Sequence, residues 1–134
     1  MTLSQAIHQR WAADEQLAAL VPPERFVTGL GADARLPYAS LISIDSSAAA
    51  QYNDRSGIDA VQLRIKCFHQ RFEQAEATLR RIIAVFDGAA MALEDGREVL
   101  LVRAVGHTLR QAEDGTWLAQ AKLQCAVYRP APDG

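Results

Sequence analysis

The sequence predicts an α+β domain in which two helices pack on one face of a mainly antiparallel sheet, in the element order α-β-β-α-β-β-β. Two segments show helical periodicity, two others alternate apolar and polar residues, and two Asp-Gly pairs are typical of tight hairpin turns. Helices segregated from hairpin-forming strands characterise the α+β class. We expect residues 1–134 to form one domain, with residues 130–134 as a frayed tail.

The first predicted helix runs from about Leu3 to Val21, where apolar residues recur on one arc of the helix. Ser4 is the expected N-cap, and Pro22-Pro23 stops the helix because proline lacks a backbone N–H group. Arg10 and Asp14 interrupt the apolar arc four residues apart, which predicts an ion pair on the helix. The alternative is that this arc is partly buried against another subunit, and both residues are then candidates for an intersubunit contact.

Two strands are predicted next, from Arg25 to Val27 and from Tyr38 to Ile44, on either side of a loop that holds Gly29 and Gly31. Ser46 to Gly57 is rich in small and polar residues, which predicts a long polar loop between strands. An ordinary hairpin loop has about two to five residues, so this length favours mobility or a binding role.

The clearest strand is Ile58 to His69, where apolar and polar side chains alternate. The second helix is predicted from about Gln70 to Asp87 and ends at Gly88, because glycine readily adopts the left-handed backbone that closes a helix. Its apolar stripe is narrow, as expected for a helix with one core-facing surface.

The C-terminal third is predicted to be an antiparallel meander, with turns at Asp95-Gly96 and Asp114-Gly115. Between these turns lies a strand from Glu98 to Arg110. Its first half is apolar on both faces, which favours a central position in the sheet. Thr116 to Tyr128 alternates again and forms the last strand.

The composition excludes several classes of protein. A net charge of −2 argues against a nucleic-acid-binding protein, which needs clustered positive charge, so we expect no nucleic-acid specificity. No apolar stretch approaches the roughly 20 residues that span a bilayer, and the N-terminus lacks the pattern of a secretory signal. We therefore expect a protein that stays in the cytoplasm of the cell that makes it, with no membrane contact.

Four residues are of the types that bind metals or act as nucleophiles: Cys67, His69, His107 and Cys125. Zinc sites usually take two closely spaced ligands from a tight turn, whereas Cys67 and His69 share one face of a predicted strand. We expect the cysteines to be small core residues and predict no metal site, no cofactor and no catalytic residue. The enzyme alternative is a Cys-His pair at Cys67, which requires a reactive, exposed thiolate.

Three basic residues, Arg64, Lys66 and Lys122, are expected near one another on the outer face of the sheet. They form either a basic patch or part of an ordinary solvated surface of mixed charge.

Six short motifs stand in the predicted elements: Leu17-Ala18-Ala19-Leu20-Val21, Arg25-Phe26-Val27, Leu36-Pro37-Tyr38, Cys67-Phe68, Gln74-Ala75-Glu76-Ala77 and Val127-Tyr128-Arg129. Together with the order of elements, from about Leu3 to Arg129, they resemble the tail-completion, or tail-terminator, proteins of long-tailed bacteriophages and prophages.

This resemblance implies a structural virion-assembly protein rather than an enzyme, without catalytic residues or cofactors. Such proteins form a ring, commonly of six subunits, that caps the tail tube, ends its polymerisation and joins the tail to the head. The implied partners are further copies of the chain, the tail-tube protein and a head-connector protein. The implied location is the bacterial host cytoplasm during assembly and then the virion tail.

A ring requires one surface patch of the subunit to fit a different patch on the next copy. Tyr52 offers an aromatic anchor in the predicted loop, and Asn53, Asp54 and Arg55 offer adaptable polar groups, so we take these four as candidate partner contacts. The alternative function is a small cytosolic ligand- or peptide-binding α+β module without catalytic activity. Its pocket would be lined by Trp117 and the second helix.

Overall fold

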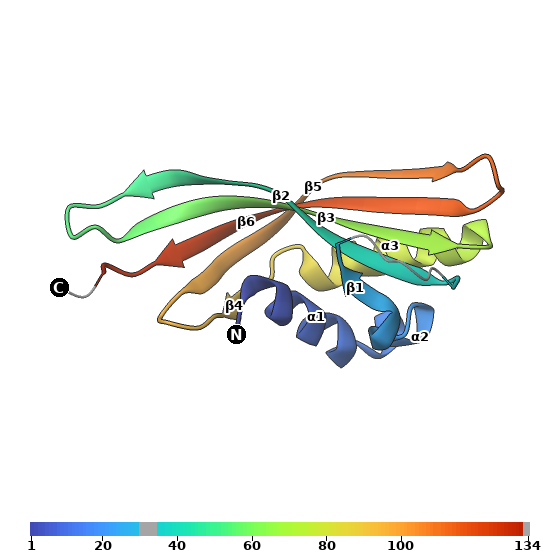
Figure 1. Ribbon diagram of the computed structural model, residues 1–134, viewed down its shortest axis with the longest axis horizontal. Coiled ribbons are helices and arrows are strands. Elements are labelled where there is room, and N and C mark those ends of the chain that lie inside the picture. Colours follow the sequence, from blue (N-terminus) through green and yellow to red (C-terminus); the bar gives the residue numbers. More distant parts are fainter. Residues whose placement is uncertain (30–34, 133–134) are drawn as a thin grey trace.

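The computed structural model describes residues 1–29 and 35–132, which fold into a six-stranded sheet with the order β1-β2-β3-β6-β5-β4 (Figure 1). Gly31 and the end of the expected C-terminal tail therefore lie outside the described residues. The strands are β1 (Phe26–Thr28), β2 (Tyr38–Gln51), β3 (Gly57–His69), β4 (Met91–Ala92), β5 (Glu98–Gln111) and β6 (Trp117–Arg129). The helices are α1 (Leu3–Ala13), α2 (Glu15–Leu20) and α3 (Phe72–Phe86), with a short 3-10 turn at Pro23–Arg25.

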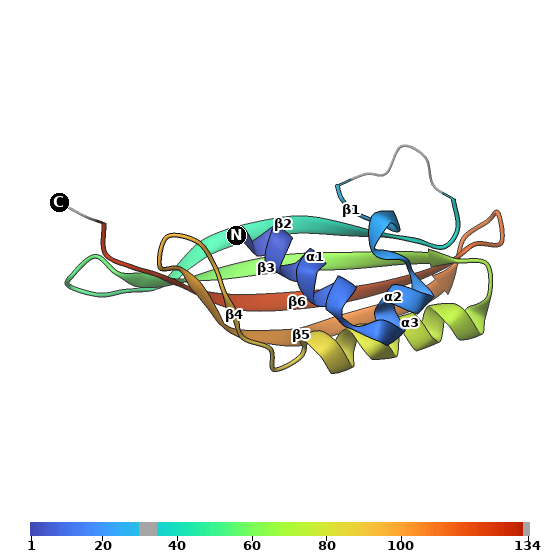
Figure 2. The ribbon, with the colours of Figure 1, turned by 90° about the horizontal axis from the view of Figure 1, so that it is seen from below.

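The predicted α+β class is confirmed. The described helices all lie on one face of the sheet (Figure 2) and leave the other face uncovered (Figure 1). The long strands pair antiparallel, and only the short β1 runs parallel to its neighbour β2. The structure adds the two-residue strand β4 to the predicted elements and divides the first helix in two.

The break in the first helix lies at Asp14, whose extended backbone separates α1 from α2. The Asp14 carboxylate accepts a hydrogen bond of 3.0 Å from the backbone N–H of Leu17, so it caps α2. The cap of α1 is also not the predicted Ser4. Thr2 accepts from the backbone N–H of Gln5, whose side chain bonds back to Thr2.

The predicted long loop from Ser46 to Gly57 is wrong, because β2 continues to Gln51 and pairs with β3 as far as Gly57. Only residues 52–56 form the turn. The small polar residues of this stretch have weak strand preference of their own. They extend because β3 pairs with β6 over its whole length and offers β2 a continuous line of backbone partners.

The predicted central position of β5 is also wrong, since β3 and β6 occupy the centre of the sheet. β5 pairs with β6 on one side and, on the other, with the two residues of β4. Its apolar outer residues are consequently exposed, with Leu100, Leu101 and Val105 retaining 40%, 41% and 53% of their accessible surface.

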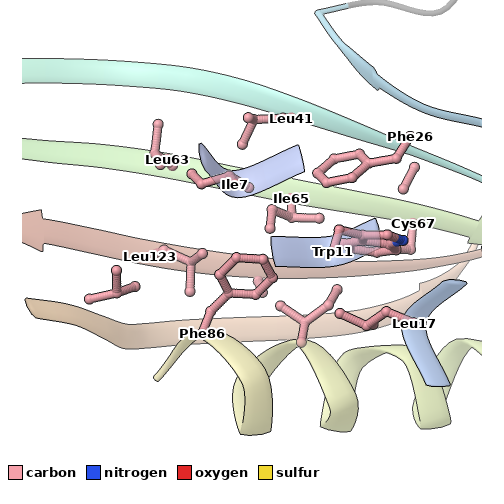
Figure 3. Packing of buried hydrophobic residues seen from close by; sticks show 14 of the residues in the cluster. Ile7, Trp11, Leu17, Phe26, Leu41, Leu63, Ile65, Cys67, Phe86 and Leu123 are labelled. Atoms are coloured by element: carbon pink, nitrogen blue, oxygen red, sulfur yellow. The ribbon is translucent and has the colours of Figure 1, made fainter. Parts of the chain in front are cut away.

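The core lies between the sheet and the helices, and Trp11 of α1 stands near its centre (Figure 3). Trp11 is fully buried, its indole N–H donates a 3.0 Å hydrogen bond to the Val21 carbonyl, and its ring lies 4.3 Å from that of Phe26. One side chain therefore joins α1, the end of α2 and the edge strand β1.

Helix α3 ends as predicted at Gly88, which has a positive φ of 83°. The Gly88 N–H donates to the Val102 carbonyl over 2.7 Å, and the Val102 N–H donates to the Ala89 carbonyl over 2.9 Å. The end of α3 is thereby bonded to the middle of β5.

We expect Asp14→Ala to lower the free energy of unfolding by about 2 kcal/mol, because it removes both the α2 cap and the partner of Arg81. Asp14→Asn keeps a good capping oxygen and should lose about half as much. Urea denaturation of both variants measures these losses.

The matched control is Glu76→Gln, which breaks the exposed pair with Arg80 at 3.5 Å and should cost less than about 0.5 kcal/mol. A loss for Asp14→Ala no larger than that of the control contradicts the prediction.

Candidate functional site

The predicted ion pair between Arg10 and Asp14 is wrong. Asp14 instead receives two hydrogen bonds from Arg81 of α3, at 2.9 Å from Nε and 2.5 Å from Nη2. The hydrogen bond from Arg81 lowers the pKa of Asp14 below its ordinary value. Arg10 donates from Nε to the Val85 carbonyl over 2.9 Å. Both residues therefore join the first helices to α3 within the same chain.

The cysteines are buried core residues, as predicted. Cys67 on β3 lies opposite Ala119, whereas Cys125 on β6 lies opposite Val61, six residues away along β3. Burial raises the pKa of the Cys67 thiol, and raises that of Cys125 to about 11. Neither thiol has the exposed, activated surroundings of a nucleophile.

The histidines also stand apart. His69 is buried beneath α3, while His107 is exposed on β5. Among residues 1–29 and 35–132, no group of three or more His, Cys, Asp or Glu side chains is placed to hold a metal ion. The described helices also include none that is long and apolar enough to cross a membrane.

His69 is held by Thr78 of α3, whose hydroxyl lies 2.9 Å from Nε2. The same hydroxyl donates to the Gln74 carbonyl over 2.8 Å, so the ring nitrogen is the donor in the first contact. Nδ1 is then an unprotonated nitrogen, buried without a partner in the described structure. Burial lowers the pKa of His69 from 6.5 to about 4, so the ring is neutral at pH 7.

The basic residues do meet on the uncovered face of the sheet. Arg64 of β3 lies directly opposite Lys122 of β6, and Lys66 lies one outward position farther along β3. None of the three forms a salt bridge with any residue in the described part of the chain. Two like charges side by side on a sheet repel each other, so this face favours contact with negatively charged groups.

The four predicted contact residues Tyr52, Asn53, Asp54 and Arg55 are brought together at the tip of the β2–β3 hairpin. All four are exposed, and Tyr52 retains 53% of its accessible surface. Asp54 accepts hydrogen bonds from the Ser56 hydroxyl, at 2.5 Å, and from the Ser56 backbone N–H, at 2.9 Å. These two bonds fix the turn and lower the pKa of the Asp54 carboxyl, the hydroxyl's bond more than the backbone's.

The hairpin is tied to the neighbouring strand by Arg129 at the end of β6. Its Nη1 donates to the Arg55 carbonyl over 3.1 Å, and its Nε lies 3.4 Å from the Asp59 carboxylate. Gly57 leaves room for this contact, since a Cβ there would stand 2.7 Å from the Arg129 guanidinium. The tip therefore presents Tyr52 from a braced backbone.

Sequence reasoning missed the exposed apolar strip on β5, formed by Leu100, Leu101 and Val105. Leu100 and Val105 are the extra residues of two bulges in the β5–β6 pairing. Bulges re-aim side chains and are common next to functional sites. The signal in the sequence is the two-faced apolar run of this strand, a pattern that also fits a strand buried within the sheet.

Trp117, the residue expected to line a ligand pocket, packs edge-on against Phe72 at the start of α3, with ring centroids 5.2 Å apart. The exposed features of the molecule are therefore a braced hairpin tip, an apolar strip and a basic face, which together suit contact with other macromolecules.

Residues 5–128 match the family model described as Tail completion protein gp17. Among solved structures, a chain of the "Virion of native gene transfer agent (GTA) particle" superposes with a TM-score of 0.76 at 18% sequence identity. The alignment covers 94% of this chain and 94% of that one. A likeness at this identity establishes a shared fold. A comparison with curated proteins finds no match.

We expect stability to fall as pH decreases from 6.5 towards 4, because the unfolded chain protonates His69 while the folded chain keeps it neutral. Between pH 7.5 and pH 5 this one group should account for about 2 kcal/mol. His69→Gln, which retains a donor for Thr78, should remove that part of the pH dependence. Urea denaturation of the wild type and of His69→Gln at both pH values measures this loss of unfolding free energy. An equal loss in the two proteins would contradict the assignment of the pH dependence to His69.

Proposed function

The chain belongs to the tail completion protein gp17 family, structural components of the virion rather than enzymes, and from this premise we propose that it forms a closed ring. The ring caps the tail tube, ends its polymerisation and joins the tail to the head. We further propose that the ring contains six copies, as is common in the proteins that the sequence resembles. The partners are other copies of the chain, a tail-tube protein and a head-connector protein.

The observation that carries this proposal is the elongated shape of the sheet, with hairpin tips at its two opposite ends (Figure 1). The β2–β3 tip, residues 52–56, lies at one end, and the β5–β6 tip, residues 112–116, lies at the other. A ring subunit between tube and head must present a different surface on each side of the ring. If the long strands run from the tube side of the ring to its head side, one hairpin tip lies on each of these two sides.

The β2–β3 tip is suited to a partner contact, because its backbone is braced and the Tyr52 side chain is exposed. Arg129 holds the carbonyl of Arg55, while the Tyr52 ring remains half exposed. Exposed tyrosine and arginine are enriched at protein contacts that contribute strongly to binding. A preformed tip also loses little conformational freedom on binding.

We expect the double variant Tyr52→Ala, Arg55→Gly to fold normally but to fail in tail assembly. Glycine is chosen because Arg55 has a positive φ of 71°, which glycine adopts without strain. The measurement is electron microscopy of particles from the parent phage or prophage, with its own copy deleted and the variant supplied. Overlong tails or tails without heads are the expected products, and normal particles would contradict the role of this tip.

A matched variant at the other end is Glu113→Ala, an exposed side chain of the β5–β6 tip. If the two tips face different partners, one variant should give tails of abnormal length and the other should give tails of normal length without heads. Identical defects from both variants would contradict the assignment of one tip to each side.

A further inference from the structure

Two stretches of the sheet edge stay unpaired in the described part of the chain. On one side, β1 pairs with β2 only at residues 39–41, and residues 45–51 of β2 have no neighbour there. On the other side, β4, the end of α3 and the Asp87 carboxylate occupy the edge of β5 as far as Ala104. Residues 105–111 of β5 are then unpaired. A free edge is a template for a further strand.

The two free stretches run antiparallel to each other when one copy follows the next by rotation about the ring axis. β2 and β5 point in opposite directions within the sheet, because three antiparallel pairings separate them. The β2 of a second copy placed beside β5 with the same orientation therefore meets it antiparallel. This is a contact between two different patches, the kind that closes into a ring.

The side chains of the two stretches are complementary in one register. Asp45 and Arg110 point to the same uncovered face, are both exposed, and form no salt bridge with any described residue. When Asp45 of one copy is placed opposite Arg110 of the next, Ser47 lies opposite Thr108. The alanines at 48–50 then lie beside the exposed His107, the small Gly106 and the exposed Val105, in that order.

From these observations we propose that subunits pair edge to edge, with residues 45–50 of one copy lying antiparallel beside residues 105–110 of the next. Asp45 faces Arg110 across this contact, and Ser47 faces Thr108. The pairing rests on the proposed ring and specifies its interface.

The geometry of a closed barrel agrees with this register. Within one sheet, Asp45 lies on the level of Gln62, and Arg110 lies on the level of Phe68, six residues along β3. The next copy is therefore shifted by six residues, about 20 Å, in the direction of the strands. The four long strands of one copy span about 19 Å in the direction across the strands. The ratio of these two lengths corresponds to a strand tilt of about 45°, the upper end of the usual range for closed barrels. A flat pairing without offset would bring Asp45 to Arg103, where the end of α3 already occupies the edge.

A charge-reversal cycle tests the register. Asp45→Arg and Arg110→Asp should each abolish incorporation of the chain into particles, and the double reversal should restore it. Arg103→Asp is the matched control, since Arg103 is exposed on the same face of the same strand. We expect Asp45→Arg to restore incorporation of the Arg110→Asp chain but not of the Arg103→Asp chain. If it restores the Arg103→Asp chain instead, the proposed register is wrong and the flat pairing is favoured.

A disulfide provides the second measurement. Ser47→Cys combined with Thr108→Cys, oxidised with diamide in purified particles, should give a ladder of cross-linked oligomers on a non-reducing gel, and neither single variant should. The natural cysteines are buried and do not interfere. Particles that contain the double variant without cross-links contradict the pairing alone. Absence of the wild-type chain from particles contradicts the proposed function, and with it the ring on which the pairing rests.

Discussion

The uninterrupted pairing of β3 with β6 is the interaction on which the rest of the structure depends. Gly57–His69 lies beside Trp117–Arg129 residue for residue, without a single bulge, whereas β2 and β5 each carry two. This bulge-free central pair supplies the backbone hydrogen-bond partners along one edge of each of the two bulged strands, β2 and β5. It also fixes which residues face the helices, because a slip of one residue would turn the apolar side chains outward. The hairpin tips take their positions from this pair.

The helices cover one face of the sheet only. The covered face holds the core that stabilises the fold, and the uncovered face is left for contacts with other molecules. The covered face holds Trp11, Ile65 and Phe86, and the ties from Asp14 to Arg81 and from Arg10 to Val85 hold the helices together. The opposite face carries unpaired basic residues. Because the core does not depend on that face or on the sheet edges, both are free to meet other molecules without loss of the fold.

In the proposed function the protein stops one polymer and begins a different contact, and the fold offers separate surfaces for these two tasks. The edges lie along the sides of the molecule, whereas the tips lie at its ends (Figure 1). The proposed contacts between identical subunits can therefore be changed without altering the proposed contacts to tube and head. Tail capping and ring formation are accordingly expected to respond to different substitutions.

The sequence by itself determined the α+β class, the strands predicted at Ile58–His69 and Thr116–Tyr128, and the helix that stops at Gly88, because each rests on local periodicity or turn chemistry. The family followed from a resemblance in short motifs and in the order of elements. The sequence also brought Tyr52 to Arg55 into one candidate group. Only the tertiary structure decided the length of β2, the position of β5 away from the centre of the sheet and the partner of Asp14. These depend on contacts between residues far apart in the chain: β3 extends residues 45–51 against their weak propensity, and Arg81 lies 67 residues beyond Asp14.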